Sequence, residues 1–130
     1  MSIHPLKNLI KNKPLFESLA SKYSTPLYIY SEERLLHNIN VLDQTLNENF
    51  DSYHICYTIK ANSNPHLITT LKAEIPSLGA DCASPGEIYI AEKGGIKGNE
   101  CIYTGNYESP DDLKVALEKG THINLDDISS

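Results

Sequence analysis

Short, continuous apolar runs alternate along the chain with longer stretches in which apolar residues recur at helical spacing. Runs rich in β-branched and aromatic residues predict buried strands, whereas apolar residues three or four positions apart predict amphipathic helices. The predicted strands are Leu27–Tyr30, Tyr53–Lys60, Leu78–Ala83, Cys101–Thr104 and Thr121–Leu125. The first predicted helix starts at Pro14 and the second spans 32–47. The next three run from Pro65 to about Lys72, from Pro85 to Gly94-Gly95, and from Pro110 to Gly120. From residue 53 onward the chain therefore repeats strand, turn and helix.

Three of the predicted helices share one starting signal, a polar capping residue followed directly by proline. The signal occurs at Asn64-Pro65, Ser84-Pro85 and Ser109-Pro110. The capping side chain accepts a backbone hydrogen bond of the first turn, and proline suits the first helical position. Glu87 and Asp112 stand three residues after their caps, which predicts two capping boxes. We interpret Ser84 and Glu87 as structural on this basis.

The last four predicted strands start roughly 21 to 24 residues apart, and each consecutive pair encloses one predicted helix. These strands lack alternating polarity, which is typical of strands buried on both faces. Strand–helix–strand units of this kind form right-handed crossovers between parallel strands. The sequence thus predicts an α/β fold with a parallel sheet, either a three-layer sandwich or a barrel.

Composition and charge narrow the classes of partner. The 130-residue chain has the length of a single domain, and its formal net charge of −6 comes with no basic block. We therefore expect no nucleic-acid partner, and no membrane span is expected because no apolar run approaches the roughly 18 residues required. Cys56, Cys82 and Cys101 lack a Cys-x-x-Cys spacing, so we expect buried free thiols in a reducing cytoplasm. The histidines show no metal-ligand spacing, and we expect no metal site.

Candidate chemistry gathers in the turns after three predicted strands, because a parallel sheet places these turns at one edge. They contain Lys60-Ala61-Asn62, then Asp81 to Ser84, then Gly105-Asn106-Tyr107. A lysine amine facing Asp81 on the neighbouring strand fits a structural ion pair. Partial burial would instead weaken the amine's hold on its proton and free it to attack a carbonyl. Both alternatives stay open on these residues alone.

Five sequence pieces, in order across residues 15–126, resemble one known family. They are Thr25-Pro-Leu-Tyr-Ile-Tyr30, Tyr57-Thr-Ile-Lys-Ala-Asn-Ser-Asn64, Gly79-Ala-Asp-Cys-Ala-Ser84 with Gly86-Glu87, Thr104-Gly-Asn106, and Ile123-Asn-Leu-Asp126. The chain resembles the N-terminal part of the pyridoxal-phosphate-dependent decarboxylases of the alanine-racemase-like barrel fold. Within that family it is most similar to the diaminopimelate decarboxylases.

The resemblance implies a fold and a site. Residues 31–130 would form the N-terminal half of a pyridoxal-phosphate-binding (β/α)8 TIM barrel with about four parallel strands, and residues 1–30 would belong with the β domain or the barrel edge. Lys60 would form the Schiff base with pyridoxal phosphate, and Asp81 would lie beside the cofactor and the lysine. The implied reaction is decarboxylation of a small amino acid, meso-diaminopimelate to L-lysine. Full-length relatives are expected to be cytoplasmic homodimers.

Two departures from the family qualify these expectations. Glu108 stands where many relatives have a lysine, so the subfamily stays open. A whole barrel needs eight strands and about 250 residues, so the phosphate loop, the remaining strands and the β domain would lie beyond Ser130. We expect the front part of an enzyme, from a truncated frame or a deliberately shortened chain, with little or no activity alone. The alternatives are an ornithine- or arginine-type decarboxylase, alanine racemase, or a non-catalytic decarboxylase-like regulator.

Overall fold

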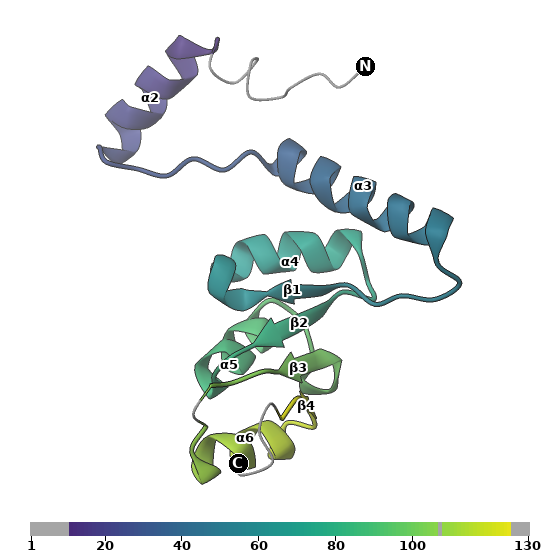
Figure 1. Cartoon of the computed structure of the whole chain (residues 1–130). Coiled ribbons are helices and arrows are strands. Elements are labelled where there is room, and N and C mark those ends of the chain that lie inside the picture. The colour runs from purple at the N-terminus through teal and green to yellow at the C-terminus, as the bar shows by residue number, and fades with distance from the viewer. Residues whose placement is uncertain (1–10, 107, 126–130) are drawn as a thin grey trace. The chain divides into compact units, whose positions relative to one another are not determined.

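The computed structural model describes residues 11–106 and 108–125 (Figure 1). The chain separates into two compact units, Met1–Asn38 and Ile39–Ser130. The division separates parts of the chain that make more contacts within themselves than with each other. It does not test the domain boundary expected between residues 30 and 31, which stays a prediction. Within the described residues, none of the helices combines the length and apolar character that a bilayer crossing requires.

The first unit contains helix α2 (Lys13–Tyr23) and the beginning of helix α3 (Glu32–Asn49). Both predicted helices are confirmed, with α3 two residues longer than expected. The predicted strand at Leu27–Tyr30 is wrong, because these residues form no strand in the structure. Tyr28 is 90% exposed. A strand needs a neighbour to bond its backbone groups, and no described residue pairs with this segment.

The second unit is built on a four-stranded parallel sheet in the order β1-β2-β3-β4 (Figure 1). The strands are β1 (Cys56–Thr58), β2 (Gly79–Cys82), β3 (Cys101–Tyr103) and β4 (His122–Ile123). The elements between them are η1 (Ile59–Ala61), α4 (Pro65–Glu74), α5 (Pro85–Lys93), η2 (Gly98–Glu100) and α6 (Pro110–Glu118). Each crossover adds its strand on the same side of the previous one. This order is that of a barrel, since a doubly wound sheet reverses direction at a switch point.

The two faces of the sheet differ in burial. One face packs against the helices and, together with them, forms the core. The most deeply buried side chains there, none more than 1% exposed, are Ile59, Ile68, Leu78, Ala80, Cys82, Ile88, Ala91, Ile96, Cys101, Tyr103 and Ala116. The other face carries one register row of Thr58, Asp81, Ile102 and His122, which are half-buried or exposed. In a barrel this second face points to the interior.

The ends of the strands differ from the sequence expectation. The predicted strand Tyr53–Lys60 shrinks to three paired residues, and Lys60 lies in the 3-10 turn η1. Among the described residues β1 pairs with β2 alone, and only Cys56, Tyr57 and Thr58 are in register with it before the chain turns into η1. Pairing therefore stops at Thr58.

The predicted helix caps form as local chemistry dictates. Asn64, Ser84 and Ser109 each accept a hydrogen bond from a backbone N–H of the first helical turn. The capping box at Ser109 is complete. At Ser84 the prediction was wrong in one detail, because the Glu87 carboxylate accepts from the Ala83 N–H at 2.7 Å rather than from the cap residue. This bond fastens the end of β2 to the start of α5.

An ion pair between α4 and η2 gives a pH-dependent contribution to stability. Lys72 Nζ lies 3.0 Å from Glu100 Oε1, and Glu100 Oε2 accepts from the Lys97 N–H at 2.8 Å. The backbone bond from Lys97, followed by Lys72, lowers the pKa of Glu100 below its usual 4.5.

The lowered pKa sets the direction of the effect. The contribution is fully present above about pH 4.5 and is lost as the pH falls through the lowered pKa. We expect Glu100→Gln to destabilise at neutral pH and to match the parent protein in acid, measured by urea unfolding at both pH values. Glu118→Gln, in an exposed pair at 4.0 Å, is the control. An equal loss at both pH values would contradict the assignment.

Candidate functional site

The carboxyl edge of the sheet brings together the turns that the sequence singled out. Thr58 ends β1 and is in register with Asp81 on β2. Lys60 follows two residues after Thr58, within η1. The structure thus places the two predicted site residues, Lys60 and Asp81, at the ends of adjacent strands. Asn106 is exposed in the turn after β3, and Tyr107 and Asp126 lie outside the described residues.

Lys60 carries an accessible amine on a well-fixed turn. Ile59, directly before it, is fully buried. On the other side, Tyr57 Oη donates to the Asn62 carbonyl oxygen at 3.0 Å, and Asn62 Oδ1 accepts from the Asn64 N–H at 3.1 Å. Buried anchoring and these two bonds hold the backbone on both sides of the lysine while its side chain stays exposed.

The structure does not contain the ion pair that was one alternative for Lys60. Within residues 11–106 and 108–125, its amine forms no hydrogen bond or ion pair, with Asp81 or any other group. The side chain is also exposed rather than partly buried. The amine is therefore free for an incoming ligand, and the protein around it, as described, adds no burial to activate it.

Asp81 is half-buried and has a partner that sequence reasoning missed. Its Oδ2 accepts a hydrogen bond from Thr58 Oγ1 at 3.1 Å. The charge of Asp81 also reaches Cys56 on the same face, where burial first and this carboxylate second raise the pKa of the thiol. The one available signal in the sequence was a hydroxyl at position 58 within an otherwise apolar run.

The third turn holds a carboxylate in an unusual setting. The Thr104 N–H donates to the Cys82 carbonyl oxygen at 2.8 Å, which ties the turn to β2. The Glu108 side chain lies against Gly105, where a Cβ atom would fall 2.6 Å from Glu108 Cγ. Glu108 Oε1 is buried and has no hydrogen-bond partner among the described residues. The Glu108 side chain thus packs against the turn, while its buried Oε1 loses the hydrogen bonds that water would give it.

We expect Glu108→Gln to stabilise the fold, because Glu108 Oε1 is buried without a partner among the described residues. Leaving a buried polar group without a partner costs about 1–3 kcal/mol, more when it is charged. A neutral amide lowers this cost and reduces the acidic field that, after burial, helps to raise the pKa of Tyr103. We expect about 1 kcal/mol greater unfolding free energy in urea. Exposed Glu118→Gln should change little, and a loss of stability in Glu108→Gln would show that the carboxylate has a stabilising partner.

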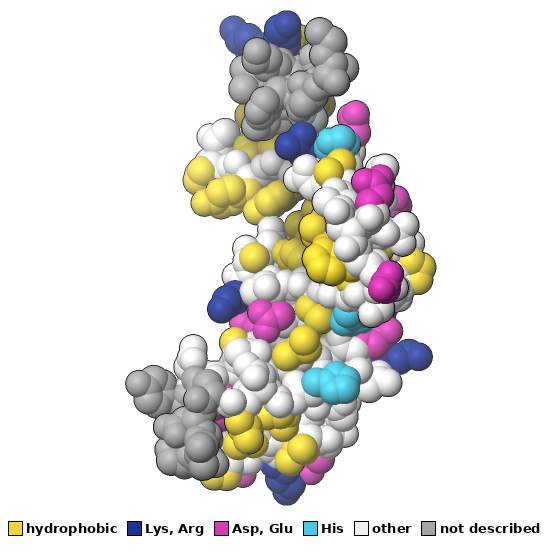
Figure 2. Space-filling view, turned by 45° about the vertical axis from the view of Figure 1, so that its right-hand side comes forward, with side chains coloured by type: hydrophobic (Ala, Val, Ile, Leu, Met, Phe, Trp, Pro, Cys, Tyr) yellow, Lys and Arg dark blue, Asp and Glu magenta, His cyan; other side chains and the backbone are white. Residues whose placement is uncertain are grey.

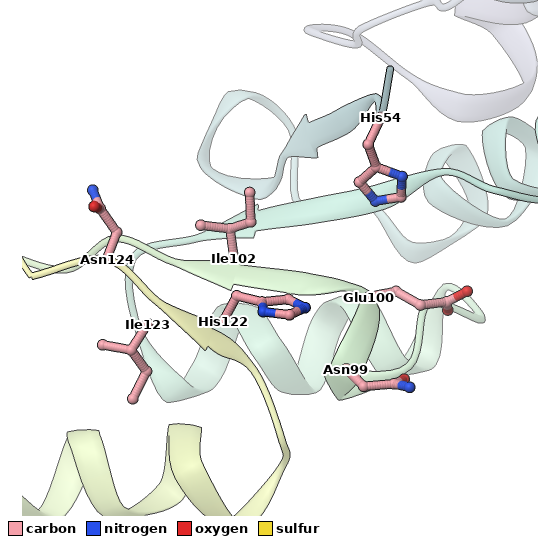
Figure 3. A pocket seen from close by; sticks show the side chains of 7 residues that line it. All are labelled: His54, Asn99, Glu100, Ile102, His122, Ile123 and Asn124. Carbon is pink, nitrogen blue, oxygen red and sulfur yellow. The ribbon is translucent and has the colours of Figure 1, made fainter. Parts of the chain in front are cut away.

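A hollow of about 690 Å³ opens on the helix-free face of the sheet (Figure 3). It is lined by His54, Asn99, Glu100, Ile102, His122, Ile123 and Asn124. In the space-filling view, histidine and hydrophobic side chains lie beside one another on the sheet-bearing part of the chain (Figure 2). Neither Lys60 nor Asp81 lines this hollow. Among the described residues, no group of three or more side chains is arranged to hold a metal ion.

The parallel strands follow one another in chain order and have their helices on one face, which makes this chain part of a (β/α)-barrel protein. Lys60 and Asp81 both lie at the carboxyl edge of its sheet. Comparison with known proteins specifies the family. The model described as "Pyridoxal-dependent decarboxylase, pyridoxal binding domain" matches residues 36–130. The chain belongs to this family. The predicted resemblance is confirmed, and so is pyridoxal phosphate as the family's cofactor.

The relatives have the same character. Diaminopimelate decarboxylase of Methanothermobacter thermautotrophicus is 37% identical over 108 residues, which cover 83% of this chain and 25% of the relative. The crystal structure of diaminopimelate decarboxylase from Helicobacter pylori with L-lysine matches with a TM-score of 0.67 at 33% identity, covering 82% of this chain and 26% of that one. Lysine decarboxylase from Selenomonas ruminantium matches with a TM-score of 0.77 at 26% identity, covering 91% and 31%. The chain spans about a quarter of the length of the curated relatives it matches.

Proposed function

We propose that this chain provides the cofactor-anchoring part of a pyridoxal-phosphate-dependent amino-acid decarboxylase, with Lys60 as the anchoring amine. The observation that supports this most directly is the free, exposed Lys60 amine at the carboxyl edge of a parallel sheet. In barrel enzymes that edge holds the catalytic groups. The match of residues 36–130 to the pyridoxal-binding domain points to the same edge.

The residues at this edge fit pyridoxal phosphate. A neutral primary amine condenses with an aldehyde and releases the carbonyl oxygen as water, and Lys60 is not engaged by any other described group. Asp81 supplies a carboxylate beside it, and the small side chains of Ala61 and Ala83 leave room for a flat ring. When bound, the cofactor supplies an electron sink for the charge left on the amino acid as carbon dioxide departs. In this proposal Lys60 holds the cofactor and Asp81 orients it.

For the substrate we propose meso-diaminopimelate, which the reaction converts to L-lysine and carbon dioxide. The diaminopimelate decarboxylases, 31–37% identical to the chain, support this choice. A lysine- or ornithine-type decarboxylase is the second candidate, supported by the match to the Selenomonas ruminantium enzyme. We also propose that the whole protein acts as a homodimer in the cytoplasm, and the free cysteines Cys56, Cys82 and Cys101 suit a reducing compartment.

A chimera tests whether this segment can serve a decarboxylase. Residues 36–130 would replace the matched part of the Methanothermobacter thermautotrophicus enzyme, and release of labelled carbon dioxide from carboxyl-labelled meso-diaminopimelate would be measured. We expect the chimera to release carbon dioxide and its Lys60→Ala variant to release none above background. A folded chimera that binds pyridoxal phosphate but is inactive would contradict the proposal and favour a regulator.

The isolated chain serves as a second arm of this test. We expect it to have little or no activity, because β1 and β4 leave two unpaired sheet edges among the described residues. Turnover of meso-diaminopimelate by the 130-residue chain would contradict this expectation. Preferential release of carbon dioxide from lysine or ornithine by the 130-residue chain would overturn the proposed substrate and leave the reaction class in place.

A further inference from the structure

We propose that Thr58 is a positioning residue of the cofactor site, whose hydroxyl fixes the Asp81 carboxylate beside the turn that carries Lys60. This inference rests on the proposed function and extends it to a residue that would act through Asp81. The observation behind it is the 3.1 Å hydrogen bond from Thr58 Oγ1 to Asp81 Oδ2.

The backbone makes this hydrogen bond possible. Thr58 and Asp81 are register partners on adjacent parallel strands, so their side chains leave the same face of the sheet. Neighbouring strands lie roughly 4.8 Å apart, a distance that a threonine hydroxyl and a carboxylate can bridge directly. Thr58 is also the last residue of β1, two residues before Lys60. One short segment therefore carries both the anchoring amine and the group that orients its acidic neighbour.

The hydrogen bond from Thr58 occupies one of the two carboxylate oxygens of Asp81. Within the described part of the chain, Thr58 is the sole hydrogen-bond donor to Asp81, and the bond uses Oδ2. The second oxygen, Oδ1, remains available to accept a hydrogen bond or a positive charge from a ligand at the edge. A carboxylate with one oxygen fixed and one free has a defined direction, which is what a ring-orienting group needs.

A purely structural role for Thr58 makes a different prediction. Threonine is favoured in strands because its β-branched side chain packs well on a pleated surface, and valine satisfies that requirement equally. The hydroxyl matters only if its bond to Asp81 matters. Thr58→Val keeps the shape and removes the bond, whereas Thr58→Ser keeps the hydroxyl and removes the methyl group.

The test measures how much pyridoxal phosphate the 130-residue chain captures on Lys60. The chain is equilibrated with increasing pyridoxal phosphate and reduced with borohydride, and the pyridoxyl-bearing Lys60 peptide is quantified by mass spectrometry. Because hydrogen bonds to charged groups are worth more than neutral ones, we expect Thr58→Val to need about ten-fold more cofactor for half-maximal capture. Thr58→Ser should restore capture to nearly that of the parent chain. Thr70→Val is the matched control, since its hydroxyl bonds the His66 carbonyl oxygen within α4.

A double-mutant cycle separates positioning from packing. In an Asp81→Ala background the hydroxyl has no carboxylate to hold, so Thr58→Val should then change capture by less than about two-fold. Urea unfolding of each variant shows that the compared proteins are folded. An undiminished ten-fold effect without Asp81, or parental capture by Thr58→Val, would overturn the role of Thr58. No selective capture on Lys60, even in the chimera that supplies the rest of the barrel, would instead overturn the proposed function, so the two failures are distinguishable.

Discussion

Lys60→Ala is expected to abolish selective capture of pyridoxal phosphate while leaving the fold intact. The amine is the only group in the proposed site that bonds covalently to an aldehyde, so its removal leaves nothing for borohydride to trap there. Lys60 is exposed and forms no hydrogen bond or ion pair with any described residue. Its replacement should therefore change the unfolding free energy by no more than about 0.5 kcal/mol.

The measurement must distinguish Lys60 from ordinary surface lysines, which also react with aldehydes. At one equivalent of pyridoxal phosphate, reduction followed by peptide mapping should place the pyridoxyl group on Lys60 in preference to the others. Lys114→Ala is the control, because Lys114 is an exposed lysine on α6 whose nearest acidic group lies 4.0 Å away. Even labelling of all exposed lysines, or unchanged labelling in Lys60→Ala, would show that Lys60 is an ordinary surface residue.

The second large effect is expected from Gly94→Ala, which should weaken the packing of α5 on α4. Gly94 caps α5 in ordinary right-handed geometry, with φ −79° and ψ −2°, so alanine meets no backbone strain there. The added Cβ would instead overlap Cβ and Cγ2 of Ile68, a fully buried residue of α4. Overpacking of this kind costs about 1–3 kcal/mol, and we expect the upper part of that range because a β-branched side chain has little freedom to move.

Gly86→Ala provides the matched comparison within the same helix. A Cβ at Gly86 would meet a single atom, Ser84 Oγ at 3.8 Å, in ordinary contact. Alanine is the better helix former, so Gly86→Ala should be neutral or stabilising by up to about 1 kcal/mol. Thermal and urea unfolding of the two variants measure the difference. Equal stabilities would mean that α4 and α5 shift apart without cost, contrary to the close packing described.

Features that depend on neighbours in the sequence could be predicted from the residues alone. Asn64, Ser84 and Ser109 cap their helices as expected because a cap is set within three or four residues. The parallel pairing of the last four strands followed from their spacing. In contrast, the choice between sandwich and barrel depends on which strands become neighbours across the sheet. That information is carried by packing, and no local pattern shows it.

The sequence predictions that were wrong or incomplete all concern residues whose partners are distant in the chain. Leu27–Tyr30 has the composition of a strand, but no described segment bonds with it, so composition alone misled. The strand before Lys60 was expected to reach the lysine, whereas register with β2 ends at Thr58. The bond from Thr58 to Asp81 joins residues on different strands, so it depends on register as well. Each case requires knowledge of a partner distant in the sequence.

The consecutive strand order also bears on how the protein is made. Each strand pairs with the one synthesised just before it, so most sheet contacts join residues separated by a single strand–helix unit. Pairing between strands one strand–helix unit apart closes shorter loops, and so costs less chain entropy, than pairing between distant strands. The segment from β1 to the start of α5 contains Thr58, Lys60 and Asp81. The three residues of the proposed site therefore lie in the part of the sheet that is synthesised first, before β3 and β4.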